Sequence, residues 1–265
     1  MITPNTPTDK NNKDWESLKE GNPWHKIFDP KTEELLERLL KNDEGFIYSG
    51  DKDIILDRNN VLEKKVKKDK MFVTSLLPKP YRGNLKDPKL VILSLNPGYK
   101  KRVKKTLFTL LEPKYQRQFI EITKENALLE ASYIISPIYE VDDVMDNGYW
   151  SSRLEDLKRD GADLSKIGLI QYIPYASDRY DSWEKDGSLE TQQFSKRIIL
   201  HLLRSDTSIL FLVMRSRKKW EELIGKEAME KYKERFIFNK NPICQSISSN
   251  NFEGQYNRIL AALKA

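Results

Sequence analysis

The chain has 265 residues, 38% of them hydrophobic, and a formal net charge of +6 at pH 7. This length allows one large domain with a sizeable core, and the charge favours a polyanionic partner such as nucleic acid, although ordinary solubility would also explain it. One cysteine and two histidines exclude an intrachain disulfide framework and a thiolate metal cluster, and argue against a histidine metal site or a Ser-His-Asp triad. No apolar run reaches the roughly 18 residues of a membrane span, and the polar start does not resemble a signal peptide, so we expect a cytoplasmic protein.

The first quarter of the chain is predicted to form an extension outside the main domain. Residues 1–14 are rich in Thr, Pro, Asn and Lys, which predicts disorder. A helix is predicted after Asp29, where leucines recur at helical spacing. Five lysines in residues 64–70 form a basic cluster, which is either a solvated helix face or a phosphate-contact patch. We therefore divide the chain into a helical N-terminal extension, residues 1–70, and a main domain, residues 71–265.

Short apolar runs that end in turn residues predict buried strands in the main domain. These runs are residues 90–95, 167–173, 209–214 and 236–238. Helical spacing of apolar residues predicts the intervening helices, at residues 114–130, 150–159, 190–204, 215–233 and 252–263. Because strands alternate with helices, we expect an α/β fold, a three-layer α/β/α sandwich with a four-stranded, mainly parallel sheet.

Polar turns follow all the predicted strands. They are Asn96-Pro97-Gly98, Pro174 to Ser177, Arg215 to Arg217, and Asn241 to Asn251. In a parallel sheet these turns share the carboxyl edge, so we expect them to build one cleft. The cleft would offer amides, hydroxyls and arginines, without histidine, paired carboxylates or a glycine-rich phosphate loop. This content argues against two-carboxylate hydrolysis and against binding of nucleoside triphosphates or dinucleotides.

Three of these segments resemble motifs of the uracil-DNA glycosylase superfamily. Leu95-Asn96-Pro97-Gly98 is similar to the first motif of the mismatch-specific and single-strand-selective branches. Gln171 lies three residues before Pro174, and this is similar to a second family segment in which an amide side chain precedes a proline by three. Asn241-Pro242, with the serines that follow, looks like a variant of the late family motif that closes on flipped DNA. The resemblance implies a DNA-repair enzyme without metal or cofactor. It would flip a pyrimidine out of DNA and hydrolyse its N-glycosidic bond to leave an abasic site, and we expect it to act as a monomer.

This chemistry needs a positioned water and stabilisation of the departing base rather than a strong nucleophile. We assign Asn96 to orienting the water; the alternative is that it only caps the following helix. Gln171 is assigned to reading the edge of the flipped base, or it is a core-edge glutamine that bonds backbone. Asn241 stands where the most active uracil-specific enzymes carry histidine, which predicts modest turnover or a better leaving group.

Further residues of the resemblance would shape the base pocket. Gly98 lacks the aromatic side chain that shields C5 of the base in the uracil-selective branch, so thymine-like or larger C5-modified pyrimidines could enter; alternatively, this glycine serves only the turn. Tyr99 would restore part of the barrier. Tyr172 or Tyr175 would stack on the base, unless both belong to the core.

DNA contacts are expected at a helix start and in the late loop. Arg215 and Arg217 would bind phosphates, or form a solvated helix start. Ile247, between Ser246 and Ser248, would fill the gap left by the flipped base, or be an ordinary buried anchor.

Three rival functions stay open. Gly98 motivates a glycosylase for bulky C5-modified pyrimidines in invading phage DNA. The missing histidine and acidic groups motivate a DNA-binding module that has lost catalysis. The same scaffold could also process free nucleosides or nucleotides, because a fold does not fix a function.

Overall fold

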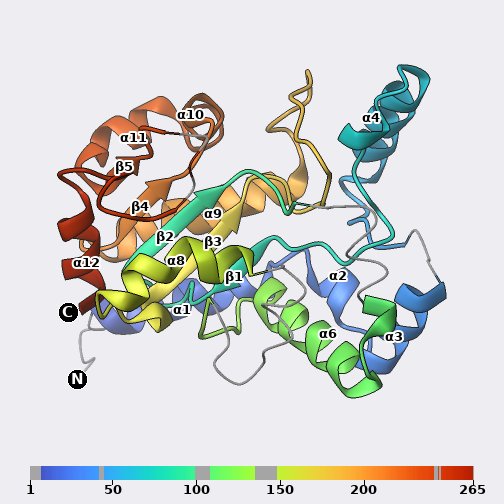
Figure 1. Ribbon diagram of the computed structural model, residues 1–265, viewed down its shortest axis with the longest axis horizontal. Helices are drawn as coiled ribbons and strands as arrows, with labels where there is room; N and C mark the ends of the chain where they lie inside the picture. The colour runs from blue at the N-terminus through green and yellow to red at the C-terminus, as the bar shows by residue number, and fades with distance from the viewer. Residues whose placement is uncertain are drawn as a thin grey trace, which may run out of the picture.

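A five-stranded sheet forms the centre of the molecule (Figure 1). The computed structural model describes residues 7–41, 45–98, 108–134, 148–241, 244 and 246–264. The strand order is β1-β3-β2-β4-β5. The strands are β1 (Tyr81–Gly83), β2 (Leu90–Ser94), β3 (Ile167–Gln171), β4 (Leu210–Val213) and β5 (Phe236–Phe238). Strand β1 runs antiparallel to β3, and the other neighbours are parallel. The mainly parallel α/β fold is confirmed, whereas the prediction of four strands is wrong.

The additional strand β1 lies outside the four predicted strands. It is only three residues long, follows Pro80 and ends at Gly83. Gly83 has a φ of +74°, and a Cβ there would lie 2.4 Å from the carbonyl oxygen of Ile167. The close pairing with β3 therefore requires glycine at this position.

The middle strands are apolar up to their last residues, Ser94 in β2 and Gln171 in β3, because both faces of the sheet are covered. Successive side chains of a strand point to opposite faces. In β2, Val91 and Leu93 belong to one hydrophobic cluster, and Leu90 and Ile92 belong to another. All four side chains are fully buried.

Helices cover both of these faces (Figure 1). The hydrophobic cluster that contains Val91 also includes buried side chains of α1 (Pro7–Glu20), α2 (His25–Phe28), α3 (Thr32–Lys41), α4 (Lys52–Lys64), α6 (Pro113–Ala127), α9 (Glu190–Ser205), α10 (Arg217–Ile224) and α11 (Lys226–Lys231). The face of Leu90 packs against α8 (Tyr149–Arg159) and α12 (Tyr256–Lys264). None of the helices within the described ranges has the length and apolar character needed to cross a membrane.

The N-terminal helices share the core of the sheet. Helix α1 begins at Pro7, within the stretch for which the composition predicts disorder. Trp15 and Trp24 are buried in the same cluster as Val91, and the ring of Trp15 lies 5.7 Å from that of His201 in α9. The segment treated as an extension therefore completes the cover of one sheet face.

Candidate functional site

The carboxyl edge of the sheet brings the predicted polar turns into one row. Asn96 follows β2, Gln171 ends β3, Arg215 follows β4 and Asn241 follows β5. Because neighbouring strands lie roughly 4.8 Å apart, the row from β3 to β5 extends about 15 Å. The single cleft expected from the sequence is thus a linear edge, with Asn96 near one end and Asn241 at the other.

The side-chain amide of Asn96 is held in one orientation by Ser177. Its Nδ2 donates to Ser177 Oγ at 2.9 Å, and Ser177 Oγ in turn donates to the carbonyl oxygen of Arg179 at 3.1 Å. Since the only hydroxyl proton of Ser177 is used at Arg179, Oγ can only accept from Asn96, which fixes Nδ2 on this side. Asn96 Oδ1 therefore faces away from Ser177, and no described residue donates a hydrogen bond to it.

The backbone joins the same two turns. Ser177 N donates to the carbonyl oxygen of Pro97 at 3.3 Å, and Gly98 and Ser177 form an isolated parallel bridge. Asn96 is half-buried and Ser177 is 1% exposed. The amide is therefore anchored by a buried partner, while Asn96 itself keeps part of its surface exposed.

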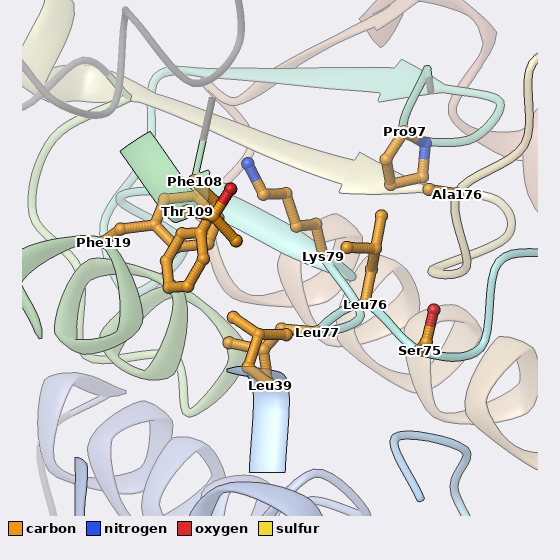
Figure 2. Close-up of a pocket in the computed structure, with 10 residues that line it drawn as sticks. All are labelled: Leu39, Ser75, Leu76, Leu77, Lys79, Pro97, Phe108, Thr109, Phe119 and Ala176. Atoms are coloured by element: carbon orange, nitrogen blue, oxygen red, sulfur yellow. The ribbon is translucent and has the colours of Figure 1, made fainter. Parts of the chain in front are cut away.

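A pocket opens beside this pair (Figure 2). Pro97, next to Asn96, and Ala176, next to Ser177, form one wall, and Phe108 and Phe119 lie across from them. The empty volume is about 670 Å³, part of it open to solvent. The other lining residues are Leu39, Ser75, Leu76, Leu77, Lys79 and Thr109. The pocket is thus mainly apolar, and Leu39 of α3 shows that the N-terminal helices help to build it.

Lys79 carries the one charge among the described residues that line the pocket. Its Nζ lies 4.9 Å from the ring centroid of Phe119 and points across the pocket (Figure 2). Phe108 and Phe119 pack against each other with 5.6 Å between ring centroids. The pocket therefore combines aromatic surface with one cation, a combination that suits a planar group acquiring negative charge.

Gln171 occupies the other sheet face at the same edge. It pairs in register with Ser94, and alternation along β3 places it on the side of Leu169. The side chain is 6% exposed, and its Oε1 is buried without a hydrogen-bond partner among the residues that the structure describes. An unpaired buried acceptor is costly unless a ligand or water supplies a donor, so this oxygen is a candidate contact. It does not line the pocket beside Asn96.

Tyr172 and Tyr175 lie in the core. Each is 1% exposed, so neither ring face is open to a ligand. Tyr172 packs edge-on against Trp220 with centroids 5.2 Å apart, and Tyr175 packs against Trp24 at 6.2 Å. The interpretation of both tyrosines as core residues agrees with this placement, and stacking on a base does not.

Tyr175 also belongs to a buried polar cluster. Its hydroxyl donates to Asp51 Oδ2 at 2.9 Å and accepts from Tyr48 N at 3.2 Å. Asp51 is fully buried and also accepts from Thr191 N at 3.3 Å and from Thr191 Oγ1 at 2.5 Å. Burial raises the pKa of the Asp51 carboxyl, and the hydrogen bonds from Thr191 and Tyr175 oppose that rise. The cluster ties the N-terminal segment to the start of α9.

Gly98 is exposed, and a Cβ placed on it would have no heavy atom of the described residues within 4 Å. Its φ is not in the left-handed region, so the turn does not require glycine here. The open position agrees with the interpretation that Gly98 leaves room for a ligand. Tyr99 lies outside the described residues.

The predicted DNA contacts are spread along the edge. Arg217 begins α10, where its Nε lies 2.6 Å from Glu221 Oε1 and its guanidinium lies 4.2 Å from the ring centroid of Phe238. Arg215 is half-buried and Asn241 is exposed. The two arginines are thus beside β4 and β5, while Asn241 is too far along the edge to share the pocket of Asn96.

The late loop packs under α8. Ile247 is fully buried, and its backbone N donates to the carbonyl oxygen of Arg153 at 3.0 Å. Ser248 accepts from Asn251 N through its Oγ at 3.3 Å, and Ser246 is half-buried. The interpretation of Ile247 as a buried anchor fits this placement; a wedge would have to leave the core.

Sequence reasoning placed Ser177 in a turn of the cleft without a role of its own, and it missed Phe108, Phe119 and Lys79 as parts of the site. Ser177 has no motif of its own, and the pocket walls come from segments far apart in the chain. Within the described ranges, no group of three or more His, Cys, Asp or Glu side chains is arranged to hold a metal ion. Comparison with family models, curated proteins and solved structures found no match to this chain.

Proposed function

We propose that this chain is a monofunctional DNA glycosylase with a three-layer α/β/α fold of the uracil-DNA glycosylase type. The observation that carries the proposal is the fixed amide of Asn96 at the carboxyl edge of the sheet. Its neighbour Pro97, not Asn96 itself, lines the aromatic pocket. The amide oxygen of Asn96 can accept a hydrogen bond from a water and direct the water lone pair toward a bound sugar carbon.

The reaction is hydrolysis of the bond between C1′ and the base nitrogen. This bond breaks with its electron pair going to the base, and the bond from C1′ to the water oxygen forms on an oxocarbenium-like sugar. The water proton is released, and the departing base anion takes up a proton. Asn96 holds the water, and the positive charge of Lys79 stabilises the negative base as it leaves. Lys79 would thus serve in place of the histidine that position 241 lacks.

Phe108 and Phe119 are 5% and 7% exposed and line the pocket that would receive an extruded pyrimidine. Gln171 Oε1 offers an additional acceptor at the same edge, on the other face. Arg215 and Arg217 would hold phosphates further along the DNA. The enzyme would act as a cytoplasmic monomer in DNA repair.

A substrate panel tests the proposal. Oligonucleotides carrying uracil, a G·T mismatch or bulky 5-hydroxymethylcytosine derivatives are incubated with the protein, and abasic sites are revealed by alkaline strand scission. We expect scission of at least one modified duplex or single strand. DNA binding without any scission would favour the non-catalytic module, and cleavage of free nucleosides alone would favour a nucleoside-processing enzyme.

Gly98 favours a second candidate, excision of bulky C5-modified pyrimidines from phage DNA. We expect Gly98→Phe to fold normally and to change the free energy of unfolding by less than about 0.5 kcal/mol, since position 98 is exposed and an added Cβ meets no heavy atom of the described residues within 4 Å. The new ring should reduce excision of C5-substituted bases at least roughly tenfold relative to uracil. The ratio of kcat/KM for the two substrates measures this, with Gly98→Ala as the control. An unchanged ratio would show that position 98 does not face C5.

Ser177→Ala tests how Asn96 is oriented. Without Oγ, the amide loses the acceptor that fixes Nδ2, and we expect kcat to fall roughly tenfold while DNA affinity is retained. The matched control is Ser195→Ala, which removes another buried serine hydroxyl, one that donates to Thr191 O at 3.2 Å in the core. Equal effects of the two substitutions on kcat would contradict the orienting role.

A further inference from the structure

The turn that ends α4 exposes a valine in a conformation that suits glycine. Val66 has a φ of +56° and is 82% exposed. The helix ends in a Schellman arrangement, in which Val66 N donates to Glu63 O and Lys67 N donates to Leu62 O, both at 2.9 Å. A β-branched residue is strained at this left-handed position. Neither local geometry nor burial in the core explains why valine stands there.

Lysines surround this valine. Residues 61–70 contain five lysines, Glu63 and Asp69, which gives a net charge of +3. Among the described residues, no carboxylate forms an ion pair with Lys64 or Lys65, and Lys68 reaches Glu63 only at 4.0 Å. All the residues from Lys64 to Lys68 are exposed. We call residues 64–68 the basic turn.

The basic turn is connected to the loop that orients Asn96. The carbonyl oxygen of the neighbouring Asp69 accepts a hydrogen bond from Arg179 N at 3.0 Å. The carboxylate of Asp69 also forms an ion pair with Arg179, with 3.6 Å between Oδ2 and Nε. The carbonyl oxygen of this same Arg179 takes the hydroxyl proton of Ser177. The basic turn is therefore linked through one residue to the partner of Asn96.

A second contact strengthens this link. Lys70 Nζ lies 2.9 Å from Asp181 Oδ2, and this hydrogen bond, with a further contribution from Lys67, lowers the pKa of Asp181. Residues of α4 and of the loop around Asp181 line a common groove with an empty volume of about 1070 Å³. In Figure 1, α4 and this loop both project from the body of the molecule, beyond the sheet.

We infer that the basic turn is a second DNA contact, which binds phosphates beside the nucleotide held at Asn96 while Val66 packs against an adjacent sugar or base. The inference rests on the proposed function in taking DNA as the ligand. The charge is complementary to a polyphosphate, and an apolar side chain among cations matches the way proteins combine backbone neutralisation with an apolar contact to a base step. The strain at Val66 is then maintained for binding rather than for folding.

Salt-dependent binding tests the lysines. Fluorescence anisotropy of a labelled duplex, unmodified or carrying uracil, gives Kd between 50 and 200 mM NaCl for wild type and for the double variant Lys64→Gln, Lys65→Gln. We expect roughly a tenfold rise in Kd at low salt, and a slope of log K against log[salt] that is shallower by about 1 to 2. The matched control, Lys158→Gln with Lys264→Gln, removes two exposed lysines near the opposite edge of the sheet. Equal slopes and affinities for the two double variants would overturn the inference.

Val66→Gly tests the valine. Relief of the strained backbone should raise Tm by roughly 2–4 °C, while the loss of the side chain raises Kd for DNA about threefold. Opposite changes in stability and affinity cannot arise from unfolding. Unchanged affinity, or a lowered Tm, would overturn the role assigned to Val66.

The outcomes separate this inference from the proposed function. If the wild type cleaves no base but the lysine variant still binds DNA more weakly with a shallower slope, the basic turn is a DNA contact and only the glycosylase activity fails. If the wild type excises bases and the lysine variant binds like its control, the inference alone fails. Binding of the wild type to phosphatidylserine vesicles, lost in the lysine variant while DNA binding is unchanged, would replace DNA by a membrane surface and overturn it.

Discussion

Asn96→Ala should reduce base excision at least roughly 100-fold, because the substitution removes the group that positions the attacking water. DNA affinity and thermal stability should change little, since the amide is half-buried and its partner Ser177 keeps its bond to Arg179. Single-turnover excision on the best substrate of the panel measures the effect without interference from product release. Asn96→Asp should retain more activity than the alanine variant, because a carboxylate oxygen also accepts a proton from water.

The control for this experiment is Asn84→Ala. Asn84 lies in the turn that precedes β2, where its Oδ1 accepts from the backbone N of Lys86 and Asp87 at 3.1 and 3.0 Å. It is thus a turn amide at the opposite edge of the same strand. If Asn96→Ala cleaves as fast as wild type, or if both alanine variants lose activity equally, the assignment of Asn96 is wrong.

Tyr175→Phe should lower the free energy of unfolding by roughly 2–4 kcal/mol while keeping the aromatic ring. The lost hydroxyl leaves Asp51 without one of its donors and Tyr48 N without its acceptor, both inside the protein. Urea denaturation followed by tryptophan fluorescence measures the change. A residue that stacks on a base would behave differently, because phenylalanine would preserve stacking and cost little stability.

Acid titration of stability provides an independent check of the same cluster. The pKa of Asp51 is raised in the folded protein, so the folded state binds the proton more tightly than the unfolded chain does. Asp51 therefore contributes its full stabilisation at a pH below its pKa in the unfolded chain. This stabilisation is lost as the pH rises through the higher pKa of Asp51 in the folded protein. Asp51→Asn should remove this component. An identical pH dependence in wild type and variant would contradict the raised pKa.

The central strands were predictable because they are buried on both faces and read as apolar runs. Strand β1 was not, since it is short, lies at the edge and contains no apolar run. Helix α4 shows no clear helical spacing of apolar residues, because its buried face includes the polar Arg58 and Asn59. These two side chains donate hydrogen bonds to the carbonyl oxygens of Lys70 and Phe72. The predicted helix over 215–233 is two helices, because Gly225 has a φ of +103° and interrupts it.

The site was predictable to the level of strand ends. Asn96 and Gln171 lie where their positions after apolar runs place them. Which face a side chain takes beyond the end of a strand depends on tertiary packing, however, and this explains why Tyr172 and Tyr175 turn into the core. Ser177 orients Asn96 through a contact between residues 81 positions apart, which no local pattern reveals.

The burial of Trp15 against α9 has a consequence for biosynthesis. The ribosome releases this indole long before His201 and its neighbours, so the nascent chain must carry an exposed aromatic segment until most of translation is complete. Transient surfaces of this kind bind chaperones and promote aggregation. A recombinant product lacking the first helices would expose the complementary surface of α9 permanently, and insoluble material is the expected yield.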